Sequence, residues 1–244
     1  MSLTHVLCVI RKIGKTIVGS GAAYVLLIPI WISKCFGRIK VHGTIPSQQQ
    51  VTSRGTLLIV NHPSLVEAIV LPAILSPWRW GPVDTNLPYS MADSRLFGRH
   101  SQWLYEYFRC ITVHRNEQSS AGKNRRTART CLRLLKNHGT LIVYPEGGRT
   151  CKGDEWNYQG QRMVRTCNPT IVKIAKRTDA KIIPVWISHG DCTKPQSLLH
   201  GYYKLFFQKK MTVTFGSPIT FSSFEVTGLE VANVLLGVIP ATKN

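Results

Sequence analysis

A short apolar run leads directly into a turn that carries chemically reactive side chains. The run Leu57–Val60 is typical of a buried strand. It ends at Asn61, and Pro63 has the fixed φ that suits the first position of a helix. Because the residue before a proline is disfavoured in helical geometry, we expect His62 to lie at the cap, outside that helix. This stretch therefore predicts a strand, a turn and a helix that ends near residue 72.

Glu67 follows His62 near the start of the predicted helix. A non-helical His62 can fold back towards Glu67, which would place a carboxylate beside the imidazole, as a general base requires. A structural interpretation stays open from these two residues alone. His62 would then only cap the helix, and Glu67 would be a first-turn acid that favours the helix dipole.

A second apolar run, Leu141–Tyr144, also leads into a polar turn. Gly147 and Gly148 would allow the backbone to approach a ligand closely, and Arg149 offers a planar group for phosphate. A glycine-rich turn alone is usually only a turn. Here it lies at the end of a strand, in a chain that already carries His62 at the end of another, and this favours a shared site.

The rest of the chain alternates between strand and helix patterns. Strands are expected at 39–43, 110–115, 182–187 and 211–215, and helices at 96–108, 123–137, 169–178 and 229–239. Residues 77–88 and 152–165 are expected to be irregular, and Pro184 favours an edge position for its strand. We predict an α/β fold, with one domain over residues 39–244 that holds a mixed, mostly parallel sheet flanked by helices.

Residues 1–38 are expected to form a separate, membrane-associating helical segment. No acidic residue precedes Glu67, and an uncharged run covers Thr16–Ser33 between lysines. Three interpretations remain open: a segment that dips into one leaflet and is anchored by Trp31, a single transmembrane helix, or a cleaved presequence. The first two share membrane attachment.

The formal charge of +19 calls for an anionic partner, such as an anionic lipid surface, a phosphorylated substrate or a nucleic acid. An apolar segment beside the basic residues, and the lack of a nucleic-acid-binding motif, favour the bilayer over nucleic acid. The seven cysteines never form Cys-x-x-Cys, so the sequence predicts neither a metal site nor a disulfide framework. Reduced thiols suit a membrane-associated protein whose active site faces the cytoplasm.

Taken in order, these motifs resemble those of the glycerolipid acyltransferases typified by 1-acylglycerol-3-phosphate acyltransferase. That family has Asn-His-x4-Asp, a strand ending in Arg, Phe-Pro-Glu-Gly-Thr-Arg-Ser, and a Val-Pro-Ile-type strand. The matching stretches here are Asn61–Glu67, Ile111–Arg115, Tyr144–Thr150 and Ile183–Val185, followed by Gly216–Ile219, which resembles the closing turn of the family.

The chain departs from the family pattern at several positions. Glu67 replaces the usual Asp and is one methylene longer. Gly148 and Thr150 replace Thr and Ser, and Cys110 stands where Gly is usual. These differences make acyl transfer a firmer expectation than any particular acceptor.

The resemblance implies acyl transfer from a thioester of coenzyme A or acyl-carrier protein to a lysophospholipid hydroxyl, foremost that of 1-acylglycerol-3-phosphate. His62 would be the general base and Glu67 would fix its tautomer and charge. Such a reaction needs no bound cofactor or metal, because one activated oxygen attacks the thioester directly. By the same resemblance, the residues that hold the acceptor phosphate or shape its pocket would be Arg115, Glu146, Gly147, Gly148 and Arg149.

Two other functions remain open from the sequence. The same fold and base could serve a different acceptor, such as another lysolipid, a glycolipid or an amine. Alternatively, a non-catalytic protein would use the positive charge to bind lipid or nucleic acid.

Overall fold

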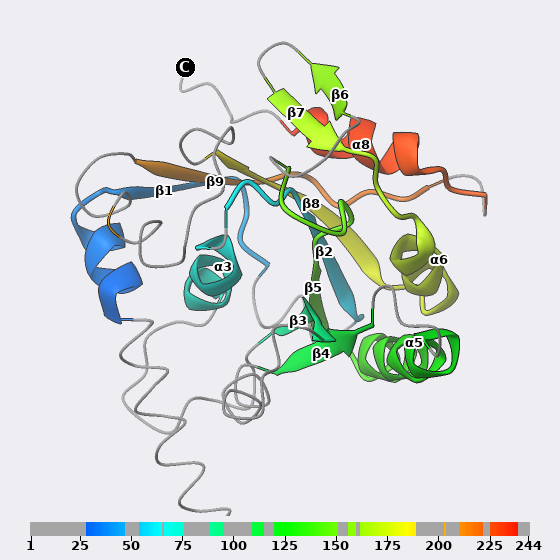
Figure 1. Cartoon of the computed structure of the whole chain (residues 1–244). Helices are drawn as coiled ribbons and strands as arrows, with labels where there is room; N and C mark the ends of the chain where they lie inside the picture. Colours follow the sequence, from blue (N-terminus) through cyan, green and yellow to red (C-terminus); the bar gives the residue numbers. More distant parts are fainter. Residues whose placement is uncertain are drawn as a thin grey trace, which may run out of the picture.

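The computed structural model describes residues 28–46, 54–64, 66–75, 88–94, 109–114, 120–150, 156–159, 162–188, 203, 210–221 and 225–238. The main sheet consists of β1 (Ile39–His42), β2 (Thr56–Val60), β3 (Tyr89–Asp93), β4 (Cys110–Val113), β5 (Thr140–Val143), β8 (Lys181–Ser188) and β9 (Met211–Phe215). Its order is β1-β9-β8-β2-β5-β3-β4 (Figure 1). The β8–β9 pair is antiparallel and the other neighbouring pairs are parallel. The predicted fold class is confirmed.

Helices cover both faces of this sheet. They are α3 (Glu67–Leu75), α5 (Ser120–Lys136), α6 (Thr170–Arg177), α8 (Gly228–Leu236) and a helix over residues 28–35. One face packs against α5, α6 and α8, and the opposite face packs against α3 and the helix over 28–35. The result is a three-layer α/β/α arrangement.

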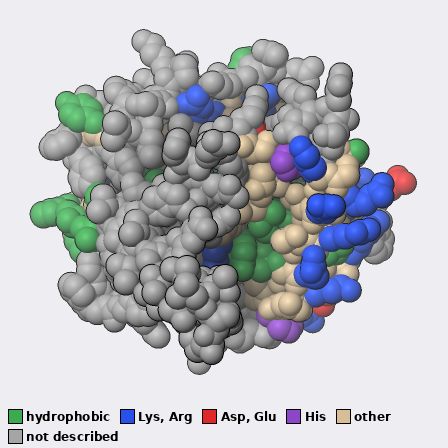
Figure 2. All heavy atoms as spheres, turned by 60° about the horizontal axis from the view of Figure 1, so that its bottom comes forward, with side chains coloured by type: hydrophobic (Ala, Val, Ile, Leu, Met, Phe, Trp, Pro, Cys, Tyr) green, Lys and Arg blue, Asp and Glu red, His purple; other side chains and the backbone are tan. Residues whose placement is uncertain are grey.

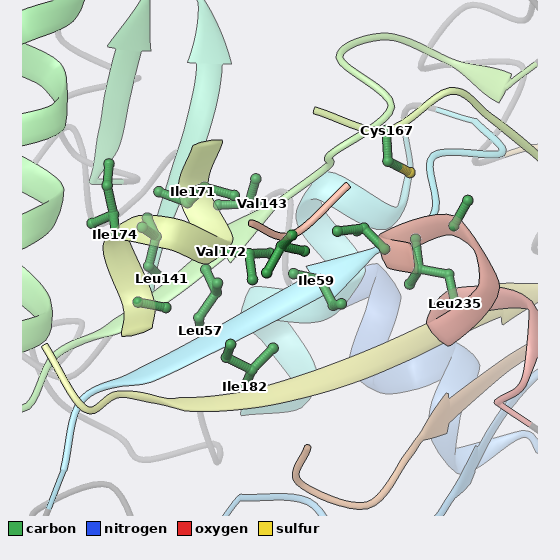
Figure 3. Packing of buried hydrophobic residues seen from close by; sticks show 14 of the residues in the cluster. Leu57, Ile59, Leu141, Val143, Cys167, Ile171, Val172, Ile174, Ile182 and Leu235 are labelled. Carbon is green, nitrogen blue, oxygen red and sulfur yellow. The ribbon is translucent and has the colours of Figure 1, made fainter. Parts of the chain in front are cut away.

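β2 shows how the sequence builds both layers at once. Leu57 and Ile59 enter the cluster beneath α5, α6 and α8 (Figure 3), whereas Leu58 and Val60 enter the cluster beneath α3. All four side chains are fully buried, and each contributes about 1.5–3 kcal/mol through the removal of apolar surface from water. A strand buried on both faces reads as a continuous apolar run, which is why this run was recognisable in the sequence.

The helix after β2 begins at Glu67, not at Pro63 as expected, and it continues through Pro72 to Leu75. In the intervening turn, the N–H and the hydroxyl of Ser64 donate to the Glu67 carboxylate.

Pro184 does not mark an edge strand, because β8 lies between β9 and β2. The Pro184 carbonyl accepts a hydrogen bond from the Gly216 N–H (2.8 Å). The nitrogen of a strand residue points to the same neighbour as its carbonyl, so the missing N–H also faces Gly216. That position lies just beyond the last β8–β9 pair, Val185 with Phe215. The proline therefore costs only one bond at the end of the ladder.

Residues expected to be irregular between positions 152 and 165 include an antiparallel hairpin, β6 (Trp156–Gln159) with β7 (Arg162–Arg165). The hairpin lies beside α8 in Figure 1. Its sequence is polar, but Val164 is fully buried and anchors one face in the core. The expectation of an irregular segment is wrong there.

The helix over 28–35 is packed against the core. Ile30 is buried in the cluster that includes α3, and the Trp31 indole N–H donates to the Ala73 carbonyl (3.1 Å). Residues 1–27, which hold most of the expected membrane segment, lie outside the described residues, as does the helix expected at 96–108. Within the described ranges, no helix has the length and apolar character needed to cross a bilayer. The boundary at residue 38 stays a prediction.

Candidate active site

Two turns lie side by side because the strands that precede them are neighbours. β2 and β5 pair in parallel, with Ile59 opposite Val143. Parallel strands end at the same edge of a sheet, so the turn after Val60 and the turn after Val143 meet there. A backbone hydrogen bond from the Thr150 N–H to the His62 carbonyl (2.9 Å) joins the two turns directly.

His62 and Glu67 are in contact, as the sequence predicted. The imidazole Nδ1 lies 2.6 Å from Glu67 Oε1. An ionised carboxylate can only accept, so Nδ1 carries the proton that forms this bond and the lone pair remains on Nε2. The Glu67 side chain is 0% exposed, whereas that of His62 is 15% exposed and can be reached from solvent. The pair has the orientation of a general base with its supporting carboxylate.

Ser64 completes the environment of Glu67 and was not singled out in the sequence. Its N–H donates to Glu67 Oε1 (2.8 Å) and its hydroxyl to Oε2 (2.5 Å). Burial on its own would raise the pKa of Glu67. The hydrogen bond and charge of His62, with further hydrogen bonds from Ser64 and the backbone, outweigh it, so the pKa lies below its usual value. The Ser-x-x-Glu spacing of a capping box was the available signal for Ser64.

Tyr144 lies against the imidazole. The rings of His62 and Tyr144 stack with centroids 4.4 Å apart and planes 27° from parallel. Burial, together with the nearby negative charge of Glu67, raises the pKa of Tyr144 well above its usual value. The stacked ring limits how far the imidazole can rotate away from Glu67.

Asn61, the residue before His62, is bound to the backbone of β8. Its side-chain amide donates to the Ile187 carbonyl (2.9 Å) and its oxygen accepts from the Ile187 N–H (2.7 Å). These bonds attach the end of β2 to β8. This partner lies 126 positions away, so no local sequence signal indicated it.

The turn after β5 contains the residues expected to hold the acceptor. Its geometry depends on Gly147, which adopts a φ of 69°, in the left-handed region that favours glycine. Gly148 and Arg149 are half-buried, and Arg149 directly precedes Thr150, which binds His62. Arg115 lies outside the described residues.

Glu146 is 5% exposed. Its Oε1 accepts from the His62 N–H (2.7 Å) and the Thr150 hydroxyl (2.9 Å), and its Oε2 accepts from the Arg165 N–H (2.8 Å). Burial raises the pKa of Glu146 above its usual value, although these hydrogen bonds and the charge of His62 partly oppose the shift.

Among the described residues, no group of three or more His, Cys, Asp or Glu side chains is placed to hold a metal ion.

An α/β sheet with a histidine–glutamate pair at the ends of its parallel strands defines a class of site in which a base can activate a hydroxyl. The family whose description is Acyltransferase matches residues 38–188, more than half of the chain. The chain belongs to this acyltransferase family, and the resemblance seen in its motifs is confirmed at that level.

A solved structure with a similar fold is that of the 1-acyl-sn-glycerophosphate (LPA) acyltransferase PlsC from Thermotoga maritima. The TM-score is 0.51 at 23% identity, and the match covers 87% of this chain and 77% of that chain. At this identity the likeness establishes the fold alone. A comparison with curated proteins finds no match.

Proposed function

We propose that this acyltransferase moves a fatty acyl group from a thioester to a hydroxyl of a lysophospholipid, with 1-acylglycerol-3-phosphate as the foremost acceptor. The observation that carries the proposal is the 2.6 Å contact between His62 and Glu67, beside the turn that holds Arg149. Membership of the acyltransferase family supports the reaction type.

In the proposed reaction, His62 Nε2 removes the proton from the acceptor hydroxyl as its oxygen attacks the thioester carbonyl. The C–O bond forms, the C–S bond breaks, and the thiolate leaves with the proton that His62 releases. Glu67 keeps Nδ1 protonated and stabilises the positive charge that develops on the imidazole. No covalent acyl-enzyme is needed, because the hydroxyl is itself the nucleophile.

Arg149 would hold the acceptor phosphate, with Arg115 as its helper. A guanidinium matches phosphate with two parallel hydrogen bonds. Gly147 and Gly148 have no side chains to obstruct the approach of the acceptor to this turn. The order of the chain places Arg149 next to the residue that binds the His62 backbone, so phosphate and hydroxyl would be held on the same side of the base.

The partners of the reaction would be the acyl donor, carried by coenzyme A or acyl-carrier protein, and an anionic bilayer that supplies the acceptor. The net charge of +19 supports the bilayer as a partner. Residues 1–38 would add membrane attachment, with the active site towards the cytoplasm.

The central test is thiol release from an acyl thioester in the presence of lysophosphatidic acid. The wild-type chain should turn over, and His62→Ala should lose activity by a factor of about 10²–10⁴, the usual contribution of a general base. Circular dichroism and thermal unfolding establish that the variant is folded. Full activity in His62→Ala would overturn the mechanism, and lipid binding without turnover by the wild type would favour a non-catalytic lipid-binding protein.

The acceptor is tested with Arg149→Ala. For a phosphate-bearing acceptor, KM should rise by about 10- to 100-fold, because a charge-assisted interaction is lost. The matched control is Arg129→Ala, at an exposed arginine on α5, which should leave KM for a water-soluble, short-chain, phosphate-bearing acceptor unchanged. Equal KM values for wild type and Arg149→Ala, or preference for a neutral glycolipid or an amine, would identify a different acceptor.

A further inference from the structure

The Glu146 carboxylate is occupied by groups of the protein itself. Three donors reach it: the His62 N–H, the Thr150 hydroxyl and the Arg165 N–H, at 2.7, 2.9 and 2.8 Å. They come from three different segments, the turn after β2, the turn after β5 and the last residue of β7. A buried carboxylate with both oxygens bound in this way has little capacity left for a substrate.

Electrostatics also argue against a direct contact between Glu146 and the acceptor. The proposed acceptor carries a phosphate, and an ionised carboxylate within a few ångströms of it would repel it in a poorly solvated pocket. Arg149, three positions along the same turn, has the charge suited to that phosphate. The turn therefore separates two tasks: Arg149 is the proposed ligand of the acceptor phosphate, and the Glu146 carboxylate is directed into the protein.

The contacts of Glu146 form part of a clamp on the His62 backbone. The N–H of His62 donates to Glu146, and its carbonyl accepts from the Thr150 N–H at 2.9 Å. The preceding residue, Asn61, is held by Ile187. Hydrogen bonds thus hold the main chain at His62 and at the residue before it, in addition to the contacts of the imidazole with Glu67 and Tyr144.

The same clamp extends to the hairpin. Arg165 ends β7, and its N–H is bound by Glu146, while the Trp156 indole N–H on β6 donates to the Thr150 carbonyl (2.9 Å). Both strands of the hairpin are therefore hydrogen-bonded to the turn after β5, which in turn binds the His62 backbone.

We propose that Glu146 is a positioning residue for His62, which holds the backbone of the base against the turn after β5 and the end of β7, and that it is not a ligand of the acceptor. This inference rests on the proposed role of His62 as the base.

The experiment compares Glu146→Gln and Thr150→Val with the wild type, and uses Glu230→Gln as the matched control. Glu230 also accepts hydrogen bonds from a backbone N–H and from a threonine hydroxyl, both of Thr227, but on the exposed start of α8. Glutamine also serves at this capping position. Thr150→Ser keeps the hydroxyl and tests for rescue.

In Glu146→Gln an amide NH₂ replaces one oxygen and faces an N–H donor, so the clamp opens on one side. We expect kcat to fall by about 10- to 100-fold, the effect of a small misplacement of a reacting group. The KM for the acceptor should stay within about threefold, because no ground-state contact is removed. Thr150→Val should show a smaller loss of kcat, and Thr150→Ser and Glu230→Gln should match the wild type. A raised acceptor KM with unchanged kcat would overturn the proposal.

A second readout does not depend on turnover. The proton on His62 Nδ1 that binds Glu67 gives a downfield NMR resonance, assigned by its loss in His62→Ala. It should shift or broaden in Glu146→Gln and stay unchanged in Glu230→Gln. An unchanged resonance in a folded Glu146→Gln variant would overturn the positioning role. A wild type without turnover would instead count against the proposed function, and a shifted resonance would still support the clamp.

Discussion

The side chain of Glu67 reaches His62 from the first residue of α3. Its Oε1 accepts from both His62 and the Ser64 N–H, while Oε2 binds the Ser64 hydroxyl. The carboxylate is thus held in place by the turn as well as by the imidazole. Glu67 therefore bonds both to the turn and to His62, so its structural role is compatible with its proposed role beside the base.

Glu67→Asp should impair the enzyme even though it restores the residue usual in the resembled family. The shorter side chain withdraws the carboxylate from a 2.6 Å contact in a fully buried setting that is built around glutamate. We expect kcat/KM to fall by about tenfold, and by more in Glu67→Gln, which also removes the charge. Steady-state kinetics would measure this, with Glu230→Gln as the control. Wild-type activity in Glu67→Asp would mean that the turn readjusts freely.

Glu67 should also make the free energy of unfolding depend on pH in the acidic range. Because the pKa of Glu67 is lower in the folded state than in the unfolded chain, its contribution is complete above the ordinary glutamate pKa. That contribution is lost as the pH falls through the lowered value. Urea unfolding at a series of acidic pH values should show the advantage of wild type over Glu67→Gln shrinking in that direction. Glu146 titrates in both proteins and cancels in the comparison; a difference that grows with acidity would contradict the assignment.

The substitution Tyr144→Phe distinguishes the contribution of the Tyr144 ring to stability from that of its hydroxyl. Among the described residues, the Tyr144 hydroxyl is buried without a hydrogen-bond partner, whereas its ring stacks on His62. Removing an unsatisfied buried group should leave the free energy of unfolding unchanged or raise it by about 1–3 kcal/mol. Denaturant titration would measure this, and Tyr158→Phe, which is 65% exposed, is the control. Marked destabilisation by Tyr144→Phe would reveal a partner for the hydroxyl.

At the scale of elements, the hairpin and α8 support each other through one arginine. Arg162 on β7 donates to the Leu236 carbonyl (3.1 Å) and to the Val238 carbonyl, at the end of α8. Its guanidinium also lies over the Trp186 ring, 5.1 Å from the centroid. The cation thus satisfies carbonyls at the negative end of the helix and stacks on β8.

Arg162→Ala should lower the free energy of unfolding by about 1.5–3 kcal/mol, because charged hydrogen bonds to the end of α8 are lost. Arg162→Lys should recover part of this, since a lysine keeps the charge but not the planar group. Denaturant unfolding followed by circular dichroism measures both. Arg129→Ala on exposed α5 should change stability by no more than about 0.5 kcal/mol. A similar small effect at Arg162 would show that the hairpin packs without this contact.

The elements that the sequence could predict are those whose own residues carry the signal. β2 and β5 were recognisable because each is an apolar run that ends at a turn. The contact of His62 with Glu67 could be anticipated because Pro63 keeps His62 out of the helix. The β6–β7 hairpin was not predicted, because its polar strands are stabilised by Val164 and Arg162 packing against distant elements.

The supports of the site were out of reach for the same physical reason. The donors to Glu146 are 84 positions away at His62 and 19 positions away at Arg165. Only the parallel pairing of β2 with β5 brings the first of them close. A local pattern can name reactive side chains, but it cannot identify the groups that hold them.

At the scale of the whole molecule, part of the excess of positive charge among the described residues lies along α5. Between residues 120 and 138 there is no acidic side chain, and six Lys and Arg side chains there are exposed: Lys123, Arg125, Arg126, Arg129, Arg133 and Lys136. Figure 2 shows Lys and Arg side chains gathered along one side of the face in view. A convex row of arginines suits an extended anionic surface better than a small ligand.

Replacing Arg125, Arg129 and Arg133 together with glutamine should weaken binding to anionic vesicles by roughly 100-fold at low salt, at about 1 kcal/mol for each cation. Vesicle flotation would measure this. Binding of the wild type should fall as salt is added, and neutral vesicles are the control. Turnover with a water-soluble short-chain acceptor should be unaffected. Unchanged binding of the triple variant would place the membrane contact elsewhere.

The central position of β2 also sets the order in which the molecule can assemble. The turn that follows β2 and carries His62 is held by Glu146 and Ile187, which follow their partners by 84 and 126 positions. Parallel pairing across such long intervals is slow, whereas a hairpin such as β6–β7 closes within about 1–10 μs. On a ribosome, His62 emerges long before the residues that immobilise it. Competence for acyl transfer is thus among the last properties that the growing chain acquires, after most of its helices and strands are available.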